Sequence, residues 1–408
     1  MPAKGCGPGA PNLYGRSMKR LLPPLAALAF ISLGLPDGLL GVAWPSIRAF
    51  FGLELDALGI LLIVTTVGYV TSSFSSGRLL RQMNLGTVLA VSCALTGAGL
   101  LGYANAAWWP LMLALGVVLG LGAGAIDAGL NTYAALHLGP RALNWLHACY
   151  GAGAATGPMI MTAVMHAGHP WQRGYMIVGG AQLALAGAFA MTAGWWPKTG
   201  GTSEGSEDAT SAPMRATLRE PAVWLGIVTF FIYTGIEASV GAWTYTLLTE
   251  GRGVAPEHAG FIASLFWGSL TAGRMLAGTA GGAVPVPTLL RIALSGLTAG
   301  TALVCLNAGL LVTAVGVALA GCACGPIFPL LVATTPSRLG TMHAANAVGF
   351  QIAAAAVGLS VLPAVVGLAA TAWGIEAMAR LCLLFTLVLA VMCESSLRIA
   401  MSRTVPAA

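Results

Sequence analysis

Uninterrupted apolar stretches of about 20 residues, the length of a membrane span, recur in this chain from Leu21 almost to the C-terminus. A helix rises 1.5 Å per residue, so each stretch is long enough to cross about 30 Å of hydrocarbon. A transmembrane strand needs about half that length and alternates polar with apolar residues, which these stretches do not do. The sequence therefore predicts an all-α membrane protein.

The composition supports the same prediction. Of the 408 residues, 57% are hydrophobic and only 8% are charged, whereas a soluble domain carries about 25% charged residues. The net charge of +6 does not indicate nucleic-acid binding, because the basic residues are spread over loops and form no patch. The eight cysteines lie mostly inside apolar stretches, so we expect buried free thiols and no disulfide framework.

The apolar stretches and the polar residues between them predict twelve spans, with both termini in the cytoplasm. The first six spans are expected at 22–46, 57–77, 84–104, 110–135, 144–166 and 174–196, and the second six at 222–247, 258–281, 286–306, 309–331, 343–368 and 374–395. A polar low-complexity segment separates these two sets and is interpreted as a cytoplasmic linker. The predicted organisation is a tail at 1–20, a six-helix bundle at 21–196, a linker at 197–221, a second bundle at 222–396 and a tail at 397–408.

The basic residues predict the orientation of the chain. The Lys19-Arg20 pair before the first span resembles a signal peptide, but the apolar run is too long and lacks a cleavage site, so it is interpreted as the first helix. With the N-terminus inside, all but four of the 19 Lys and Arg residues fall at inner loops or helix ends. Cytoplasmic loops are enriched in Lys and Arg. We therefore expect a multi-pass protein of the inner cell membrane.

A short motif occurs at equivalent positions in the two halves. SSGRLLRQ, at 75–82, follows the second span, and TAGRMLAG, at 271–278, lies near the end of the eighth span. Chance recurrence in a glycine-rich chain is the alternative, but internal repeats are typical of transporters. The motif gives five candidate gating-loop residues, which are Gly77, Arg78, Arg81, Gly273 and Arg274.

Three of the thirteen acidic residues, Asp37, Asp127 and Glu237, lie within predicted spans. An ionised carboxylate at the bilayer centre is unfavourable by about 3 kcal/mol, so each should face an interior cavity or stay protonated. Because burial favours the protonated form, such a group can take up and release a proton during transport. The alternative is a structural acid bonded within the bundle. Asp37, which follows Pro36, and Asp127 are the proton-coupling candidates.

Polar side chains near Asp127 are candidates for binding a solute. Asn131 lies four residues after this acid, on the same stripe of the helix. The next span carries Asn144 and His147, which are three residues apart. For His147 we expect hydrogen bonding to the solute and not a proton-carrying role.

The second half supplies further candidates. Tyr233 and Glu237 share one stripe of the seventh span, beside Trp243, where hydrogen bonds and stacking would hold a hydroxylated ring. An aromatic belt at the membrane interface is the alternative for the aromatic residues. Asn346 and Gln351, in the eleventh span, either line the cavity or bond another helix.

The sequence contains no GxxxxGK[ST] phosphate loop, HExxH motif or paired CxxC motif. We therefore expect no ATP drive, no metal, no cofactor and no enzymatic activity. The expected partners are a small-molecule substrate, protons and the lipid bilayer. The protein is expected to act as a monomer.

These motifs resemble the fucose permease-like branch of the major facilitator superfamily, which includes sugar–proton symporters and rhizopine-type transport proteins. In that branch the fourth span carries an acid and, four residues later, Asn, as at Asp127 and Asn131. A fifth-span segment begins with Asn and leads into a glycine-rich helix, as in LNWLHACYGAGAATGP at 143–158. The first-span acid matches Asp37, and WGSLTAGRMLAG (267–278) and GPIFPLL (325–331) are similar to the second half.

The resemblance implies two helical bundles with alternating access, in which membrane acids bind sugar and carry the coupling proton. One departure concerns the loop after span two, where the superfamily has Gly, three residues and then Asp-Arg. This chain has Gly77 followed by Arg81 and Gln82 at the last two positions, so a base replaces the acid. A charge latch in this loop is therefore not expected.

Together these observations predict a proton symporter that moves a sugar, cyclitol or similar polar metabolite. Two alternatives stay open at the level of sequence. A proton-coupled exporter of drugs or metabolites would share the fold but have a more apolar cavity. A membrane receptor would bind a solute without transporting it.

Overall fold

The computed structural model describes residues 21–137, 139–196, 212–280 and 284–404, and its regular elements are helices. The long helices of the first half are α2 (Leu22–Phe51), α3 (Ala57–Gln82), α4 (Leu85–Asn105), α5 (Trp109–His137), α6 (Gly139–His166) and α7 (Gln172–Thr192). Those of the second half are α9 (Pro221–Thr246), α10 (Pro256–Ala280), α11 (Val286–Leu306), α12 (Leu310–Ala333), α14 (Thr341–Trp373) and α15 (Ala377–Thr404). Shorter elements are η1 (Ala193–Trp195), α8 (Met214–Thr217), η2 (Leu247–Gly251) and α13 (Thr335–Leu339).

Ten helices in the described residues are long and apolar enough to cross a membrane, judged by length and composition. The other two long helices, α6 with 28 residues and α10 with 25, coincide with the fifth and eighth predicted spans but are not among the ten. The all-α membrane class is thus confirmed. The number of twelve spans stays a prediction.

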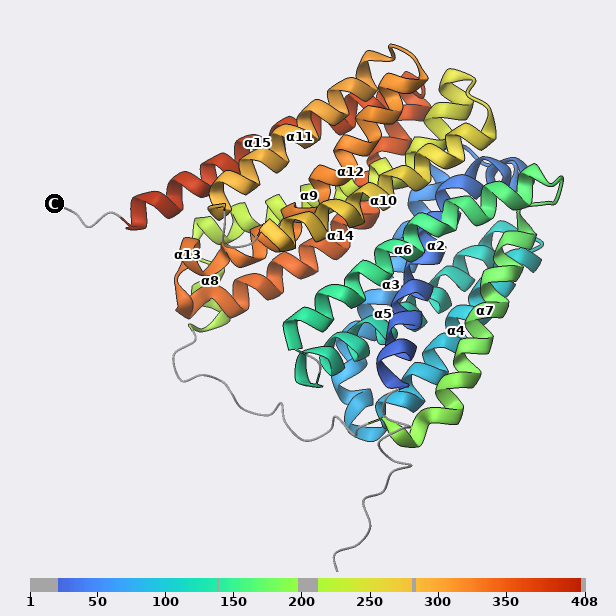
Figure 1. Ribbon diagram of the computed structural model, residues 1–408, viewed down its shortest axis with the longest axis horizontal. Coiled ribbons are helices and arrows are strands. Elements are labelled where there is room, and N and C mark those ends of the chain that lie inside the picture. The colour runs from blue at the N-terminus through green and yellow to red at the C-terminus, as the bar shows by residue number, and fades with distance from the viewer. Residues whose placement is uncertain (1–20, 138, 197–211, 281–283, 405–408) are drawn as a thin grey trace, which may run out of the picture.

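The helices form two groups that lie side by side (Figure 1). In the first half, α2 packs on α6, α3 packs on α5, and α4 packs on both α5 and α7. In the second half, α9 packs on α14, and α12 lies between α10 and α11. The two groups meet where α6 contacts α10, α3 contacts α14, and α2 contacts α9.

Glycines bring α2 and α6 into close contact around Asp37. A Cβ at Gly34 would lie 2.1 Å from the carbonyl oxygen of Tyr150, and one at Gly153 would lie 2.0 Å from that of Ile31. Small residues allow helix backbones to approach closely in a membrane. Helix α2 runs without a break through Pro36, so the glycines of this segment serve packing.

The glycines of the fourth span have the same role between α5 and α3. A Cβ at Gly120 would lie 2.0 Å from the carbonyl oxygen of Thr65, and one at Gly124 would lie 2.2 Å from that of Tyr69. These glycines therefore allow α5 and α3 to pack closely. This contact brings Tyr69 beside Asp127.

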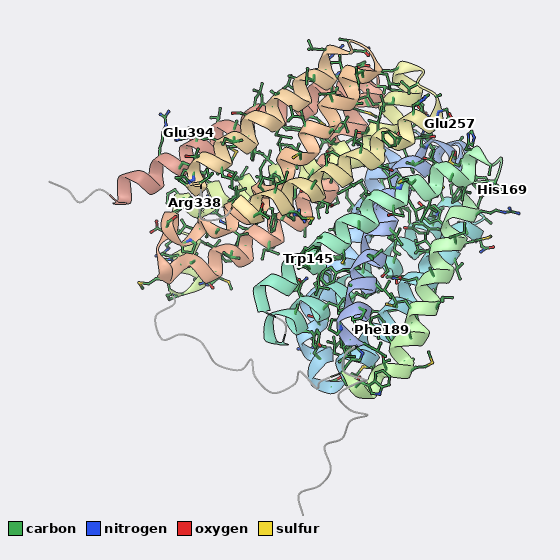
Figure 2. All side chains as sticks on the ribbon, in the orientation of Figure 1. Trp145, His169, Phe189, Glu257, Arg338 and Glu394 are labelled. Carbon is green, nitrogen blue, oxygen red and sulfur yellow. The ribbon has the colours of Figure 1, made fainter. Side chains whose placement is uncertain are left out.

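Two side-chain contacts join the groups at one end of the molecule. Nη2 of Arg48, in the last turn of α2, contacts both carboxylate oxygens of Glu250 in η2, at 2.8 and 2.7 Å. Nδ1 of His166, at the end of α6, lies 2.7 Å from Oε1 of Glu257, in the first turn of α10. Glu257 lies at the opposite end of the molecule from Arg338 (Figure 2). We call Arg48, Glu250, His166 and Glu257 the end clasp.

The seven cysteines in the described residues, from Cys93 to Cys393, are all free thiols. Four of them, Cys93, Cys324, Cys382 and Cys393, are buried.

Candidate functional site

A cavity of about 340 Å³ lies between the two helix groups. Its wall comes from α2, α3, α4, α5, α6 and α7 on one side and from α9, α10 and α14 on the other. The wall is largely apolar, and its polar lining side chains are Ser32, Asp37, Thr65, Thr66, Tyr69, Thr96, Asp127, His147, Tyr150, Gln182, Glu237, Trp267 and Arg274. Mostly apolar pockets with a few converging polar groups are typical of small-molecule sites.

Asp127 lines this cavity from α5 and is held by two hydrogen-bond donors. The hydroxyl of Tyr69, on α3, donates to Oδ2 at 2.5 Å, and Nδ2 of Asn131 donates to Oδ1 at 2.8 Å. Both oxygens of the carboxyl group are therefore fixed by protein. Asn131 was a candidate for binding the solute, but it bonds Asp127 and does not line the cavity.

Asp37 lines the cavity from α2 and is accessible from it. The hydroxyl of Tyr150, on α6, donates to Oδ2 of Asp37 at 2.6 Å. The close packing of α2 on α6 brings these two side chains together. Among the described residues, the other oxygen of this carboxyl group accepts no hydrogen bond.

Glu237 lines the cavity from α9 and repeats this arrangement in the second half. The Tyr233 hydroxyl, one turn earlier on the same helix, donates to Oε2 of Glu237 and lies 2.8 Å from the carbonyl oxygen of Cys324. Tyr233 itself is fully buried behind the wall. Each of the three intramembrane acids therefore faces one cavity and accepts a hydrogen bond from a tyrosine.

His147 and Arg274 complete the charged and titratable groups of the described cavity wall. His147 packs edge to face on Phe30, with ring centroids 5.4 Å apart, and lies within electrostatic range of both Asp127 and Arg274. The repeated motif made Arg274 a gating-loop candidate. It lies instead within α10 and lines the cavity. The preceding Gly273 packs against the backbone of Cys322 on α12.

The remaining gating-loop candidates lie in the last turns of α3. Gly77, Arg78 and Arg81 are all helical, and Arg78 is exposed. The side chains at positions 77 and 81 lie outside the described residues. A gating role for these positions stays a prediction.

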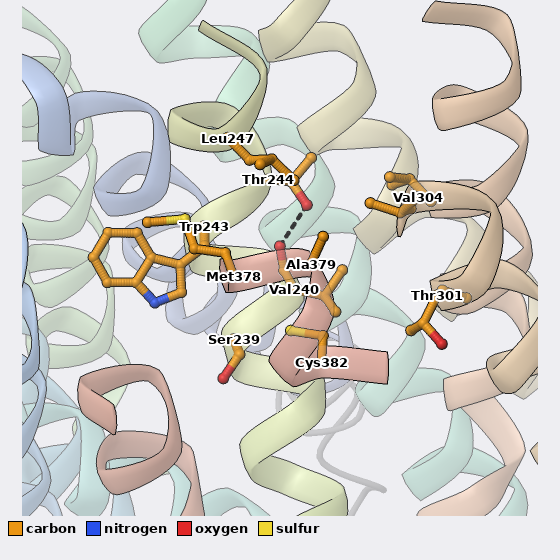
Figure 3. A pocket seen from close by; sticks show the side chains of 12 residues that line it. Ser239, Val240, Trp243, Thr244, Leu247, Thr301, Val304, Met378, Ala379 and Cys382 are labelled. Carbon is orange, nitrogen blue, oxygen red and sulfur yellow. Dashed lines mark hydrogen bonds between the residues drawn. The ribbon is translucent and has the colours of Figure 1, made fainter. Parts of the chain in front are cut away.

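Trp243 is buried away from the cavity. Its Nε1 donates to the carbonyl oxygen of Pro363 at 3.0 Å, and its side chain is 1% exposed. It lines a second, small pocket of about 30 Å³ inside the second half, together with Ser239 and Thr244 (Figure 3). The Thr244 hydroxyl donates to the carbonyl oxygen of Val240 at 2.6 Å, which leaves this pocket apolar.

Asn346 and Gln351 bond neighbouring segments, which is one of the two alternatives that the sequence left open. Nδ2 of Asn346 donates to the carbonyl oxygen of Ala212 at 2.8 Å, just before α8. Oε1 of Gln351 accepts from the hydroxyl of Thr335 at 2.9 Å. Neither residue lines the central cavity. The side chain of Asn144 lies outside the described residues.

Sequence reasoning missed eight polar residues of the cavity wall, which are Tyr69, Tyr150, Gln182, Trp267 and the hydroxyl residues Ser32, Thr65, Thr66 and Thr96. Tyr150 follows His147 by three residues and shares its stripe of α6, so helical spacing offered a signal. Tyr69 and Gln182 lie on helices with no intramembrane charge to draw attention to them. Within the described residues, no group of three or more His, Cys, Asp and Glu side chains could hold a metal ion.

The model of the Major Facilitator Superfamily matches residues 26–281, which is more than half of the chain. The chain belongs to this superfamily. Its members are generally transporters and not enzymes. The resemblance inferred from the sequence is thus confirmed at the level of the superfamily.

Curated relatives of the chain are distant. Bypass of stop codon protein 6 of Saccharomyces cerevisiae is 24% identical over 275 residues, which are 62% of this chain and 55% of that protein. Sodium-dependent glucose transporter 1 of Homo sapiens is 21% identical over 286 residues, which are 61% of this chain and 54% of that protein. The chain thus spans about half the length of the curated relatives it matches.

Solved transporters share the fold over nearly the whole chain. A bacterial homologue of the human lysosomal transporter Spinster has a TM-score of 0.74 at 13% identity, covering 98% of this chain and 100% of that one. The nucleoside transporter NupG has a TM-score of 0.73 at 14% identity, covering 94% and 98%. The transporter FucP has a TM-score of 0.61 at 15% identity, covering 93% and 99%.

Proposed function

We propose that the protein is a proton symporter that moves a small polar solute, of the sugar or cyclitol type, by alternating access. The observation that carries the proposal is the set of three intramembrane acids on one cavity wall, each bonded by a tyrosine. A carboxyl group next to a phenol can exist ionised, accepting the hydrogen bond, or protonated. Asp37 and Asp127 are the proposed proton carriers.

The proposed solute site uses the same wall. His147, Gln182 and Glu237 are side chains of three different helices that meet at the lumen and can hydrogen-bond hydroxyl groups. The polar groups favour a hydroxylated solute over an apolar drug, because an unpartnered buried polar group is unfavourable by about 1–3 kcal/mol. Proton symport of such a solute is thus better supported than drug export.

The proposed topology has twelve spans, with both termini on the cytoplasmic side of the inner membrane. The two domains, 21–196 and 222–396, would rock about the central cavity as a monomer. The described state would be closed at the end clasp and open on the side that holds α8 and α13. Alternating access between two helix bundles around a fixed midplane site is a general mechanism of secondary transporters.

The test measures proton entry into proteoliposomes that contain a pH-sensitive dye. Sugars and cyclitols are added outside, with and without an imposed pH gradient, and a sodium gradient serves as a separate arm. The proposal predicts that at least one solute causes proton entry and accumulates with the proton gradient. Accumulation driven by sodium alone, or solute binding without transport, would contradict it.

The control variant is Glu394→Gln, because Glu394 pairs with Arg291 on an exposed face remote from the cavity. This variant should transport like the parent protein. Loss of proton entry in Asp127→Asn but not in Glu394→Gln would locate coupling in the cavity.

A further inference from the structure

Two side chains that line the central cavity from one face of α10 carry hydrogen-bond donors. Trp267 and Arg274 lie two helical turns apart and both line the cavity. Trp267 is 7% exposed, and its Nε1 has no acceptor among the described residues. Nε of Arg274 reaches only the carbonyl oxygen of Gly325, at 3.3 Å. This wall therefore offers donors that lack strong acceptors.

The guanidinium group of Arg274 is not neutralised by a nearby acid. No ion pair joins it to Asp37, Asp127 or Glu237 in the part of the chain that the structure describes. Each of these carboxyl groups accepts a hydrogen bond from a tyrosine instead. Arginine stays protonated in proteins, and a charge inside a membrane protein is normally paired or hydrated. An anionic group of a ligand is the partner that Arg274 lacks.

We propose that the transported solute is a polyhydroxylated monocarboxylate of the sugar-acid class, whose carboxylate binds Arg274 and Trp267. This inference rests on the proposed function and adds the charge of the solute to it. A guanidinium group and a carboxylate match in shape and can form two parallel hydrogen bonds. The indole N–H adds a third donor at the same wall.

The opposite wall suits the hydroxyl groups of such a solute. Asp37 and Asp127 are acceptors there, and Oε1 of Gln182 is buried without a donor among the described residues. Gln182 is 2% exposed, and its Nε2 is already bound to the hydroxyl of Thr96 at 2.7 Å. The free amide oxygen therefore calls for a donor such as a solute hydroxyl.

The charges of the wall favour a solute with a single negative charge. A phosphate group brings a charge of about −2. Arg274 could balance only one of these charges, and the three carboxyl groups of the cavity would repel the other. A monocarboxylate brings one negative charge, which Arg274 balances. Entry of one such anion with one proton moves no net charge, so uptake should not respond to the membrane potential.

The experiment compares hexoses with the matching hexuronates, using glucose with glucuronate and galactose with galacturonate. Binding is measured by thermal stabilisation of the purified full-length protein, and uptake is measured in proteoliposomes at several membrane potentials. The variants are Arg274→Gln and Arg274→Lys, with Arg291→Gln as the control on an exposed helix face. Size-exclusion chromatography confirms that each variant is folded.

The inference predicts that a hexuronate binds the parent protein at least about tenfold more tightly than its hexose, which corresponds to about 1.4 kcal/mol. Arg274→Gln should remove this preference while hexose binding changes little, Arg274→Lys should keep part of it, and Arg291→Gln should keep all of it. Equal binding of the hexose and its hexuronate by the parent protein would overturn the inference. So would an equal loss of hexose and hexuronate binding in Arg274→Gln.

Failure of the inference differs from failure of the proposed function. If a hexose enters with protons and its hexuronate does not, the solute is neutral and only the inference is wrong. If no member of any pair binds or enters, both the inference and the proposed polar-solute function are wrong.

Discussion

Breaking the end clasp should shift the protein toward a state that is open at that end. Glu250→Gln removes the charge that Nη2 of Arg48 contacts at 2.7 and 2.8 Å. The two side chains are only 25% and 26% exposed, so water screens the pair incompletely. A hydrogen bond to a charged group contributes about 1.5 kcal/mol or more when buried, and an exposed ion pair contributes less than about 1 kcal/mol. We therefore expect a loss of about 1 kcal/mol, or roughly a fivefold change in the equilibrium between the two states.

The measurement is the distance between spin labels on the two helix groups at the clasp. The labels are attached at Ala167→Cys in the first helix group and Ala255→Cys in the second, after replacement of the native cysteines. Both positions are exposed. In Glu250→Gln, the ratio of long to short label distances should rise about fivefold, because a loss of about 1 kcal/mol changes the equilibrium by that factor. Glu394→Gln, which breaks an ion pair within the second half, should leave the ratio unchanged. An unchanged distribution in Glu250→Gln would refute the assignment of the clasp as a gate.

Two further predictions concern stability. Gly153→Ala should destabilise the protein by about 1–3 kcal/mol through overpacking, because the new Cβ would lie 2.0 Å from the carbonyl oxygen of Ile31. Gly187→Ala is the control and should not destabilise the protein, because a Cβ there has nothing within 4 Å. Equal melting temperatures of the two variants would contradict this prediction. Hydrogen bonds from Arg252 lower the pKa of Glu376, so the Arg252–Glu376 pair stabilises the fold above the ordinary glutamate pKa. This stabilisation is lost as pH falls through the lowered pKa. Glu376→Gln should therefore lower the melting temperature at pH 7 but not at strongly acidic pH, and a pH-independent difference would contradict this.

The sequence predicted the helices well because apolar length alone specifies a membrane span. The boundaries differ where a helix continues beyond the apolar core, as α2 does through Pro45 to Phe51. A transmembrane helix can contain proline, because neighbouring helices can hydrogen-bond the backbone groups that lose their partner at the proline. Helix α2 accordingly continues through Pro36 without a break.

The site was predictable only where a charge stands out in an apolar background. Asp37, Asp127 and Glu237 all lie at one cavity because carboxyl groups in a membrane need a polar environment. The tyrosines that bond them could not be paired from sequence, because Tyr69 and Asp127 are 58 residues apart and meet only through helix packing.

Placement also decides the role of residues that share a motif. Arg78 and Arg274 each follow a glycine in the repeated motif, yet Arg78 is exposed at the end of α3 and Arg274 faces the cavity. Arg78 lies near the end of α3 at Gln82, and Arg274 lies near the end of α10 at Ala280. Their different surroundings therefore depend on which helices pack beside each residue, which the motif alone does not specify.

The most direct measurement separates exchange from accumulation in Asp127→Asn. In proteoliposomes, counterflow of a bound solute requires binding and alternating access, whereas accumulation against a gradient also requires a proton carrier. Asp127→Asn should keep counterflow but lose accumulation driven by a pH gradient. Full accumulation in this variant would show that the Asp127 carboxyl group does not couple transport to protons.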